Sequence, residues 1–258
     1  MTTQTWKPIV WTCALLVFSI ARGSAAPTDT VEAQPQPLPK VSATVSKERE
    51  AWRKSMMQTA RPGKGCFTAT YPEKTWKAVA CGKAPNRPYG PAVGIRPSTV
   101  GGGTDFSAQV TANTTQGEGS FDSVNGVMNE NDNGNANTFS LQLNTNRFTS
   151  NACNTFHATD PGCQAWEQFI YSNSPSLFIQ YWLLPFAAAG TACPAGWNAF
   201  NWPTPQQVSC FINSVMANNN VPVQNITALG TMKLDGFVGD EATLTIGNTL
   251  YTAPGDNL

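Results

Sequence analysis

Histidine is nearly absent from this chain: His157 is the only one among 258 residues. A serine triad needs a histidine base beside an activated serine, and no Gly-x-Ser-x-Gly surrounds any serine here. The sequence also lacks a Walker phosphate loop, a paired-histidine helix and a Cys-x-x-Cys pair. These absences argue against triad hydrolases, nucleotide-driven enzymes and zinc proteins, and they predict a protein with no metal and no cofactor.

Charged residues are scarce as well, at 12% of the chain. Asn, Thr, Ser, Gly and Pro fill the gaps between short apolar runs, which favours strands and turns over helical bundles. The charges are unevenly placed, with a net +9 over residues 1–100 and −9 over residues 101–258. An acidic body argues against binding of nucleic acid. The composition therefore predicts an all-β protein whose partner is not a nucleic acid.

The first 26 residues have the three parts of a secretory signal. Lys7 precedes an apolar core over residues 9–20, and the small residues 24–26 come before Pro27. About twelve apolar residues are too few to span a bilayer, which argues against the alternative of a membrane anchor. We expect cleavage after Ala26 and a mature protein that is secreted, extracellular and no longer in a membrane.

Removing the signal also removes Cys13 and leaves six of the seven cysteines. An even number in a secreted chain is typical of disulfides, each of which contributes about 3 kcal/mol. Short loops cost least to close, so the order along the chain favours three local pairs: Cys66 with Cys81, Cys153 with Cys163, and Cys193 with Cys210. Six cysteines allow fifteen pairings, and the spacing alone leaves the others open.

Proline and glycine mark the predicted boundaries. Residues 27–43 hold four prolines and predict an extended linker. Residues 44–98 predict a helix and a small basic lobe closed by the first disulfide. Within residues 99–258 apolar side chains alternate with polar ones, as at 104–112 and 137–148, which predicts a jelly-roll-like antiparallel β-sandwich. The Asn-rich stretch 129–137 predicts a long hairpin loop, with a calcium site as the alternative.

The predicted helix starts at Ser46, a suitable N-cap, and stops at the Arg-Pro-Gly of residues 61–63. Trp52 and Met56 lie one turn apart on one side, and charged residues that include Arg53 take the rest. Such a stripe predicts docking onto the parent domain. The alternative is a removable or partner-binding segment.

The densest aromatic and aliphatic run, residues 163–186, predicts a hairpin around turn residues 172–176. If Tyr171 faces Leu177, antiparallel pairing sets the opposite neighbours for the whole hairpin. One face, which we call the Trp–Gln face, then consists of four side chains: Trp166, Gln168, Gln180 and Trp182. The opposite face is apolar apart from Glu167 and is predicted to be buried.

Two aromatic planes beside two neutral amides suit an extended neutral polymer. We therefore predict that the Trp–Gln face, with Gln142 as a neighbour, binds an extracellular polysaccharide or peptide. The alternative is that these side chains lie under other structure as ordinary core.

Several motifs carry a resemblance to known proteins: GCFTATYP, APNRPY, NTFSLQLNTN, CQAWEQFIYSN, FIQYWLL and ACPAGW. From about Gly65 onward the chain resembles a family of secreted, functionally uncharacterised bacterial proteins. That resemblance implies further Cys-rich strands after Leu258, so we expect a C-terminally shortened form.

More distantly, a Trp-containing strand, a Phe-x-x-Tyr-Trp strand and a following Cys-Pro are similar to the neprosin-type glutamic peptidases, which have a jelly-roll-like sandwich fold. Those enzymes place a catalytic Glu three residues before the first Trp, where this chain has Cys163, and Glu167 follows the Trp instead. The resemblance implies an alternative function, an acid-acting glutamic-type peptidase or other carboxylate-dependent hydrolase. Glu167, acting with Gln180 or a second carboxylate, is its candidate catalytic residue.

Overall fold

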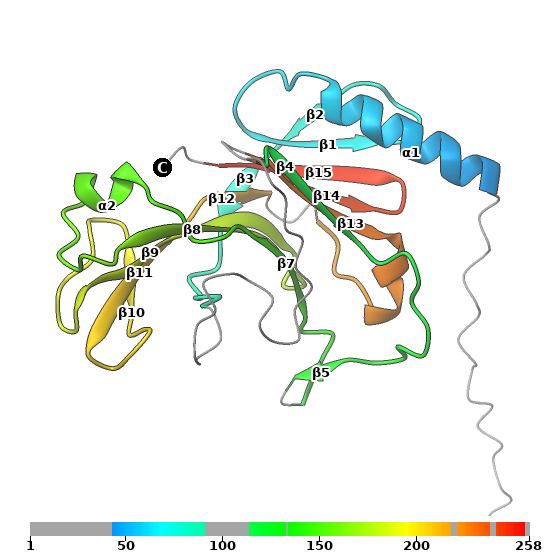
Figure 1. The fold of residues 1–258 in the computed structure, drawn as a ribbon. Helices are drawn as coiled ribbons and strands as arrows, with labels where there is room; N and C mark the ends of the chain where they lie inside the picture. Colours follow the sequence, from blue (N-terminus) through cyan, green and yellow to red (C-terminus); the bar gives the residue numbers. More distant parts are fainter. Residues whose placement is uncertain (1–42, 91–113, 133, 218–220, 238–240, 256–258) are drawn as a thin grey trace, which may run out of the picture. The chain divides into compact units, whose positions relative to one another are not determined.

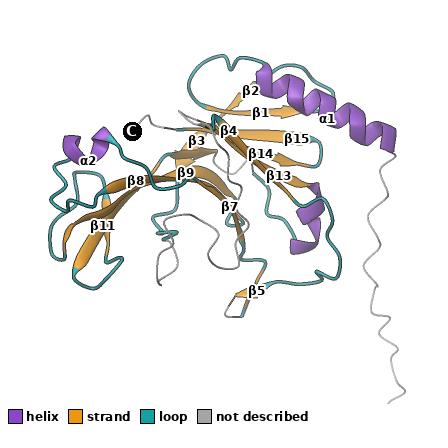
Figure 2. Cartoon of the chain, in the orientation of Figure 1, coloured by secondary structure: helices purple, strands orange, loops and turns teal. Residues whose placement is uncertain are grey.

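Antiparallel strands dominate the computed structural model of the protein (Figures 1 and 2). It describes residues 43–90, 114–132, 134–217, 221–237 and 241–255. All of these belong to the unit Val41–Leu258. The predicted signal peptide, nearly all of the predicted linker and the predicted strand 104–112 lie outside the described residues. The predicted all-β class is confirmed.

One sheet has six strands in the order β2-β1-β15-β14-β13-β4, with antiparallel neighbours throughout. Its strands are β1 (Cys66–Thr70), β2 (Lys77–Val79), β4 (Gln116–Ser120), β13 (Met232–Phe237), β14 (Glu241–Ile246) and β15 (Thr249–Pro254). Gly247 has a φ of 56° between β14 and β15, a conformation that glycine adopts without strain.

The other sheet has five strands in the order β10-β11-β9-β8-β7. They are β7 (Ser140–Asn144), β8 (Gln164–Ser172), β9 (Ser176–Ala188), β10 (Asn198–Phe200) and β11 (Gln207–Asn213). The predicted hairpin is β8 and β9, and its predicted register is confirmed: Tyr171 pairs with Leu177, Gln168 with Gln180, and Trp166 with Trp182.

Shorter elements complete the fold. Two small ribbons pair β3 (Cys81–Lys83) with β12 (Val215–Ala217), and β5 (Asn131–Asp132) with β6 (Asn135–Ala136). The second ribbon lies in the stretch 129–137, so the predicted hairpin loop is confirmed. Two short helices are α2 (Asn151–Thr155) and the 3-10 helix η1 (Ile226–Thr231).

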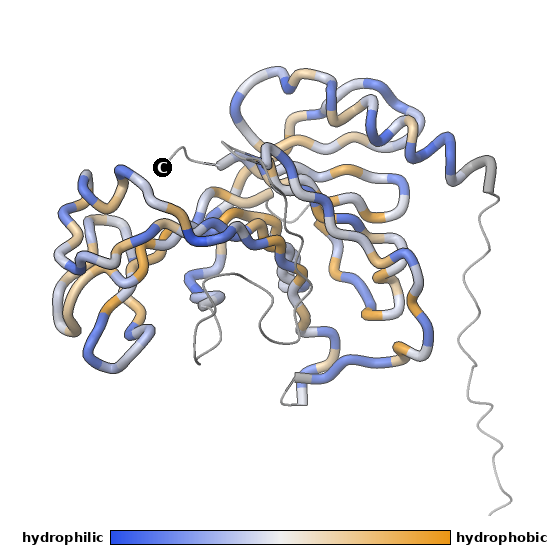
Figure 3. The backbone as a smooth tube through the Cα atoms, in the orientation of Figure 1, coloured by the Kyte–Doolittle hydropathy of each residue, from blue (hydrophilic) through white to orange (hydrophobic). Residues whose placement is uncertain are grey.

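The apolar faces of the two sheets pack together into one core. The five-stranded sheet contributes the face predicted to be buried, with Phe169, Ile179 and Tyr181 among its members, and the six-stranded sheet contributes Leu234 and Leu244. Figure 3 shows hydrophobic stretches along these strands, interrupted by hydrophilic ones, as expected for strands with one buried face. The sheets approach so closely that a Cβ at Gly236 would lie 2.3 Å from the Phe169 ring. The sandwich is therefore confirmed.

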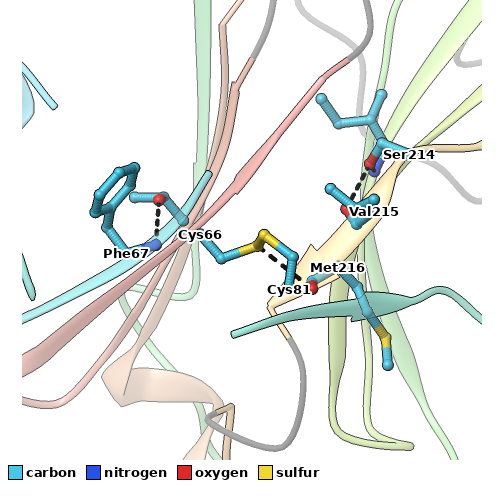
Figure 4. Close-up of a disulfide and its surroundings, with 8 residues drawn as sticks. Cys66, Phe67, Cys81, Ser214, Val215 and Met216 are labelled. Atoms are coloured by element: carbon cyan, nitrogen blue, oxygen red, sulfur yellow. Dashed lines mark hydrogen bonds between the residues drawn. A yellow bond between two sulfur atoms is a disulfide. The ribbon is translucent and has the colours of Figure 1, made fainter. Parts of the chain in front are cut away.

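The three predicted local disulfides are confirmed: Cys66–Cys81, Cys153–Cys163 and Cys193–Cys210. The first joins β1 to β3, and its Cys66 sulfur lies 3.4 Å from the carbonyl oxygen of Met216 on β12 (Figure 4). Because β1 also pairs with β15, the segment predicted as a separate basic lobe contributes a strand to the sandwich itself.

The N-terminal helix, α1, runs from Ala43 to Gln58. It begins three residues before the predicted N-cap, so the prediction for Ser46 is wrong: no glycine or proline in residues 43–45 stops the helix there. Trp52 and Met56 are buried against Phe67 and Leu250 of the six-stranded sheet. The predicted docking of the helix is confirmed.

Arg53, which the sequence places on the polar side of the helix, is also buried, with 4% of its surface exposed. It donates a hydrogen bond to Asp235 on β13 at 3.0 Å and pairs with Glu50 and Glu118. Asp235 is fully buried and accepts a second hydrogen bond, from Gln116. Burial raises the pKa of Asp235, and the nearby Arg53 offsets this only in part. The resulting pKa is about 6. The buried Arg53 thus connects α1 to two neighbouring strands, β13 through Asp235 and β4 through Glu118.

We expect Arg53→Met to lower the free energy of unfolding by about 3 kcal/mol at pH 8, because Asp235 is left buried without its cation. The loss should be smaller at pH 5, where Asp235 takes up a proton. Urea unfolding at both pH values measures it. Lys54→Met is the matched control, since this neighbour has a side chain that is 69% exposed. The ion pair would be contradicted if Arg53→Met lost the same free energy of unfolding at both pH values and if adding Asp235→Asn to this variant did not restore any of it.

The same cluster predicts maximal stability at mildly acidic pH. The stabilisation that Asp235 gains on protonation is present at low pH and is lost as the pH rises through about 6. Burial by itself raises the pKa values of Glu50 and Glu118, but hydrogen bonds and charge from Arg53 and Lys233 outweigh it and lower them below 4.5. Their stabilisation is lost as the pH falls below that value. Thermal unfolding measured from pH 3 to 8 should show the highest Tm between pH 4.5 and about 6. In Asp235→Asn, the decrease of Tm above about pH 6 should be smaller than in the wild type.

Candidate functional site

The Trp–Gln face lies on the outer side of the β8–β9 hairpin. Strand alternation puts its four side chains on one surface, and the Trp166 and Trp182 ring centroids are 6.3 Å apart. Gln142, on the neighbouring β7, pairs with Ile170 of β8 and points to the same side. The structure therefore brings together all the side chains predicted to bind a polymer.

These side chains do not form the open surface that the prediction assumed. The exposed fractions of Trp166, Gln168, Gln180 and Trp182 are 5%, 1%, 0% and 1%. Only Gln142, near the edge of the sheet, is exposed. Most of the face is thus covered, as the alternative interpretation had it.

Aromatic residues cover one end of the face. Trp182 packs against Phe211 of β11 and Phe200 of β10, with ring centroids 5.0 and 5.8 Å away. Trp202 joins this cluster at 2% exposed, and the Arg147 guanidinium lies 4.7 Å from its ring. The loop between Cys193 and Cys210 therefore caps the end of the sandwich, and Trp202 is not a platform for ligand.

A loop segment, residues 85–89, covers the amide end. Gln180 accepts a hydrogen bond from the Tyr89 backbone N–H at 2.7 Å and donates to the Arg87 carbonyl at 3.0 Å. Asn213 of β11 accepts from Gln180 at 2.6 Å and donates to the Pro85 carbonyl at 2.8 Å. Side-chain amides thus bind this segment much as the backbone of a further strand would.

The remaining amides form a chain toward the surface. The Trp182 indole N–H donates to Gln168 at 2.7 Å and to Gln180 at 3.1 Å. Gln168 in turn donates to Gln142 at 3.2 Å and to Asn144 at 3.3 Å. Gln142 and Asn144 are exposed on β7. The hydrogen-bonded chain therefore begins in the interior and ends at an exposed pair of amides, which we call the amide border.

Glu167, the candidate catalytic residue, lies apart from these amides. It pairs with Tyr181 on the inner face of the hairpin and is 8% exposed. Gln168 and Gln180 point to the opposite side of the same strands. The structure does not bring Glu167 together with Gln180, and its catalytic role stays a prediction.

Neutral groups dominate the chemistry of this site. The hydrogen bonds described above involve amides, backbone groups and an indole, so the border can recognise hydroxyl and amide groups. No group of three or more His, Cys, Asp or Glu that could hold a metal ion occurs among the described residues. Within that same part of the chain, no helix has the length and apolar character needed to cross a membrane.

Sequence reasoning missed two members of the network. Asn144 lies two residues after Gln142 on the same strand, so strand alternation was a signal that could have found it. Asn213 comes from β11 and meets Gln180 only through the pairing of β11 with β9. No local pattern indicates that contact.

We expect Gln180→Met to lower the free energy of unfolding by about 2 kcal/mol, because it leaves the Tyr89 N–H and the Arg87 carbonyl without their partner. The Tyr89 amide should also exchange its hydrogen faster. Urea unfolding and hydrogen exchange measure the two effects, with Gln206→Met, at an exposed position, as the control. Unchanged exchange at Tyr89 would show that Gln180 does not hold this segment.

Comparisons with protein-family models, curated proteins and solved structures each found no match to this chain. The resemblances to secreted bacterial proteins and to glutamic peptidases therefore stay predictions from sequence motifs. One geometric feature distinguishes the site: a network of neutral amides that is buried at Gln180 and exposed at Gln142 and Asn144.

Proposed function

We propose that the protein is a secreted binding protein that holds an extended, neutral extracellular polymer, a polysaccharide or a peptide, at the amide border. The observation that carries this proposal is the fixed position of Gln142 and Asn144. Both accept hydrogen bonds from Gln168, which is itself held by Trp182. Exposed groups that are already ordered lose less conformational entropy when a ligand binds.

The extracellular setting is supported by the three disulfides, which are typical of proteins that leave the reducing cytosol. It agrees with the signal peptide that the first 26 residues predict. A polymer outside the cell is thus a ligand that this protein would meet.

The neutral character of the ligand follows from the chemistry of the border. An amide offers both donors and acceptors but no charge, so it matches sugar hydroxyls or peptide groups better than ions. Hydrolysis by Glu167, the alternative implied by the glutamic-peptidase resemblance, has less support because Glu167 faces the core between the sheets.

We expect the double variant Gln142→Ala/Asn144→Ala to bind its polymer about 30-fold more weakly, because two hydrogen bonds of roughly 1 kcal/mol each are lost. Retention on cellulose, chitin and a denatured-protein matrix measures this. The control is Gln206→Ala, an exposed glutamine away from β7, which should bind like the wild type.

Two results would count against the proposal. One is failure of the wild-type protein to be retained on any of the three matrices. The other is equal retention of the wild type and the double variant, since binding would then lie elsewhere on the surface.

A further inference from the structure

The backbone of β7 has a definite orientation that the hydrogen bonds at its two ends reveal. The Asn173 N–H donates to the Phe139 carbonyl, and the Thr145 N–H donates to the Glu167 carbonyl, each at 3.0 Å. Both pairs belong to the β7–β8 register, so the odd-numbered residues of β7 are the ones that hydrogen-bond to β8. In an antiparallel pair the residues between them turn their N–H and C=O groups the other way.

Ser140, Gln142 and Asn144 are therefore the residues whose backbone groups point out of the sheet. β7 is the last strand of the five-stranded sheet, and within the described part of the chain no partner binds these groups. The side chains of Gln142 and Asn144 are also exposed. Unpaired backbone groups and the amide border thus lie along the same edge.

This edge also lacks the features that usually prevent strands from pairing. Natural proteins protect an edge with lysine, proline, a bulge or an inward charge. β7 reads Ser-Leu-Gln-Leu-Asn, without charge or proline, and its register with β8 is unbroken over all five residues. Its outward groups recur at every second residue, roughly every 7 Å.

We propose that β7 binds an extended polypeptide as an additional strand, with the amide border contacting alternate side chains of that peptide. This rests on the proposed function and narrows its ligand to a peptide. A regular series of N–H and C=O groups is complemented by another peptide backbone, which a polysaccharide does not provide. The neutral amides of Gln142 and Asn144 favour polar, uncharged side chains at the facing positions of the peptide.

A pair of substitutions at one position separates backbone pairing from side-chain recognition. Gln142→Ala removes the amide but keeps the outward N–H, whereas Gln142→Pro removes both. Proline is tolerated on an edge strand where its missing N–H would point to solvent, so pairing with β8 is retained. For a blocked decapeptide of alternating Thr and Gln, we expect Gln142→Pro to weaken binding at least fivefold more than Gln142→Ala does.

Modified peptides test the same point on the wild-type protein, independently of how the variants fold. N-methylation of every Thr, or of every Gln, blocks the N–H groups on one edge of the extended peptide. In an NMR titration we expect one of these two peptides to bind within about twofold of the parent and the other at least tenfold more weakly. Hydrogen exchange at Gln142 and Asn144 should be fast in the free protein and slow in the complex.

Several outcomes would overturn strand addition: no binding of the parent decapeptide at millimolar concentration, equal binding of both methylated peptides, or slow exchange at Gln142 and Asn144 in the free protein. Cellohexaose is the comparison ligand. If cellohexaose binds the wild type while the decapeptide does not, and if Gln142→Ala and Gln142→Pro weaken cellohexaose binding equally, the proposed polymer binding is supported and strand addition is excluded. If neither cellohexaose nor the decapeptide binds the wild type, both the polymer-binding function and strand addition are refuted.

Discussion

The antiparallel pairing of β8 with β9 is the constraint on which the rest of this structure depends. It places Phe169 and Ile179 on the inner face against the six-stranded sheet, and it turns Gln168 and Gln180 outward. A shift of one residue would reverse every side chain of the hairpin. The turn is held independently, because the Asn173 side chain donates to the carbonyls of Asn137 and Gln224.

The outer face of the hairpin shows how polar side chains can be buried with their hydrogen bonds satisfied. Gln168 and Gln180 have almost no exposed surface, yet each makes several hydrogen bonds of acceptable length. Satisfied amides in a low-dielectric setting order their neighbours, and an unsatisfied one would cost about 1–3 kcal/mol. This network holds residues 85–89 at one end and the exposed side chains of β7 at the other, so the proposed binding and the stability of the fold depend on the same contacts.

The N-terminal helix is attached by a different kind of interaction. Trp52 and Met56 supply apolar contact, and Arg53 adds a buried charge that meets Asp235 and Glu118 on neighbouring strands. A buried ion pair contributes little net stability compared with an apolar substitute, but it tolerates few other arrangements. We therefore assign Arg53 to fixing the position of the helix on the sheet.

Local patterns in the sequence determined the all-β class and the register of the central hairpin and favoured the three disulfides, because each depends on residues close together in the chain. The tertiary structure decided what covers each surface. Trp166 and Trp182 look like an exposed aromatic platform in the sequence, but Phe200 and Trp202 pack over them. Arg53 looks solvated, but Asp235 lies 182 residues away in the sequence and 3.0 Å away in space. Alternation tells which side chains share a face, whereas burial depends on which distant segment packs against that face, and no local pattern encodes that contact.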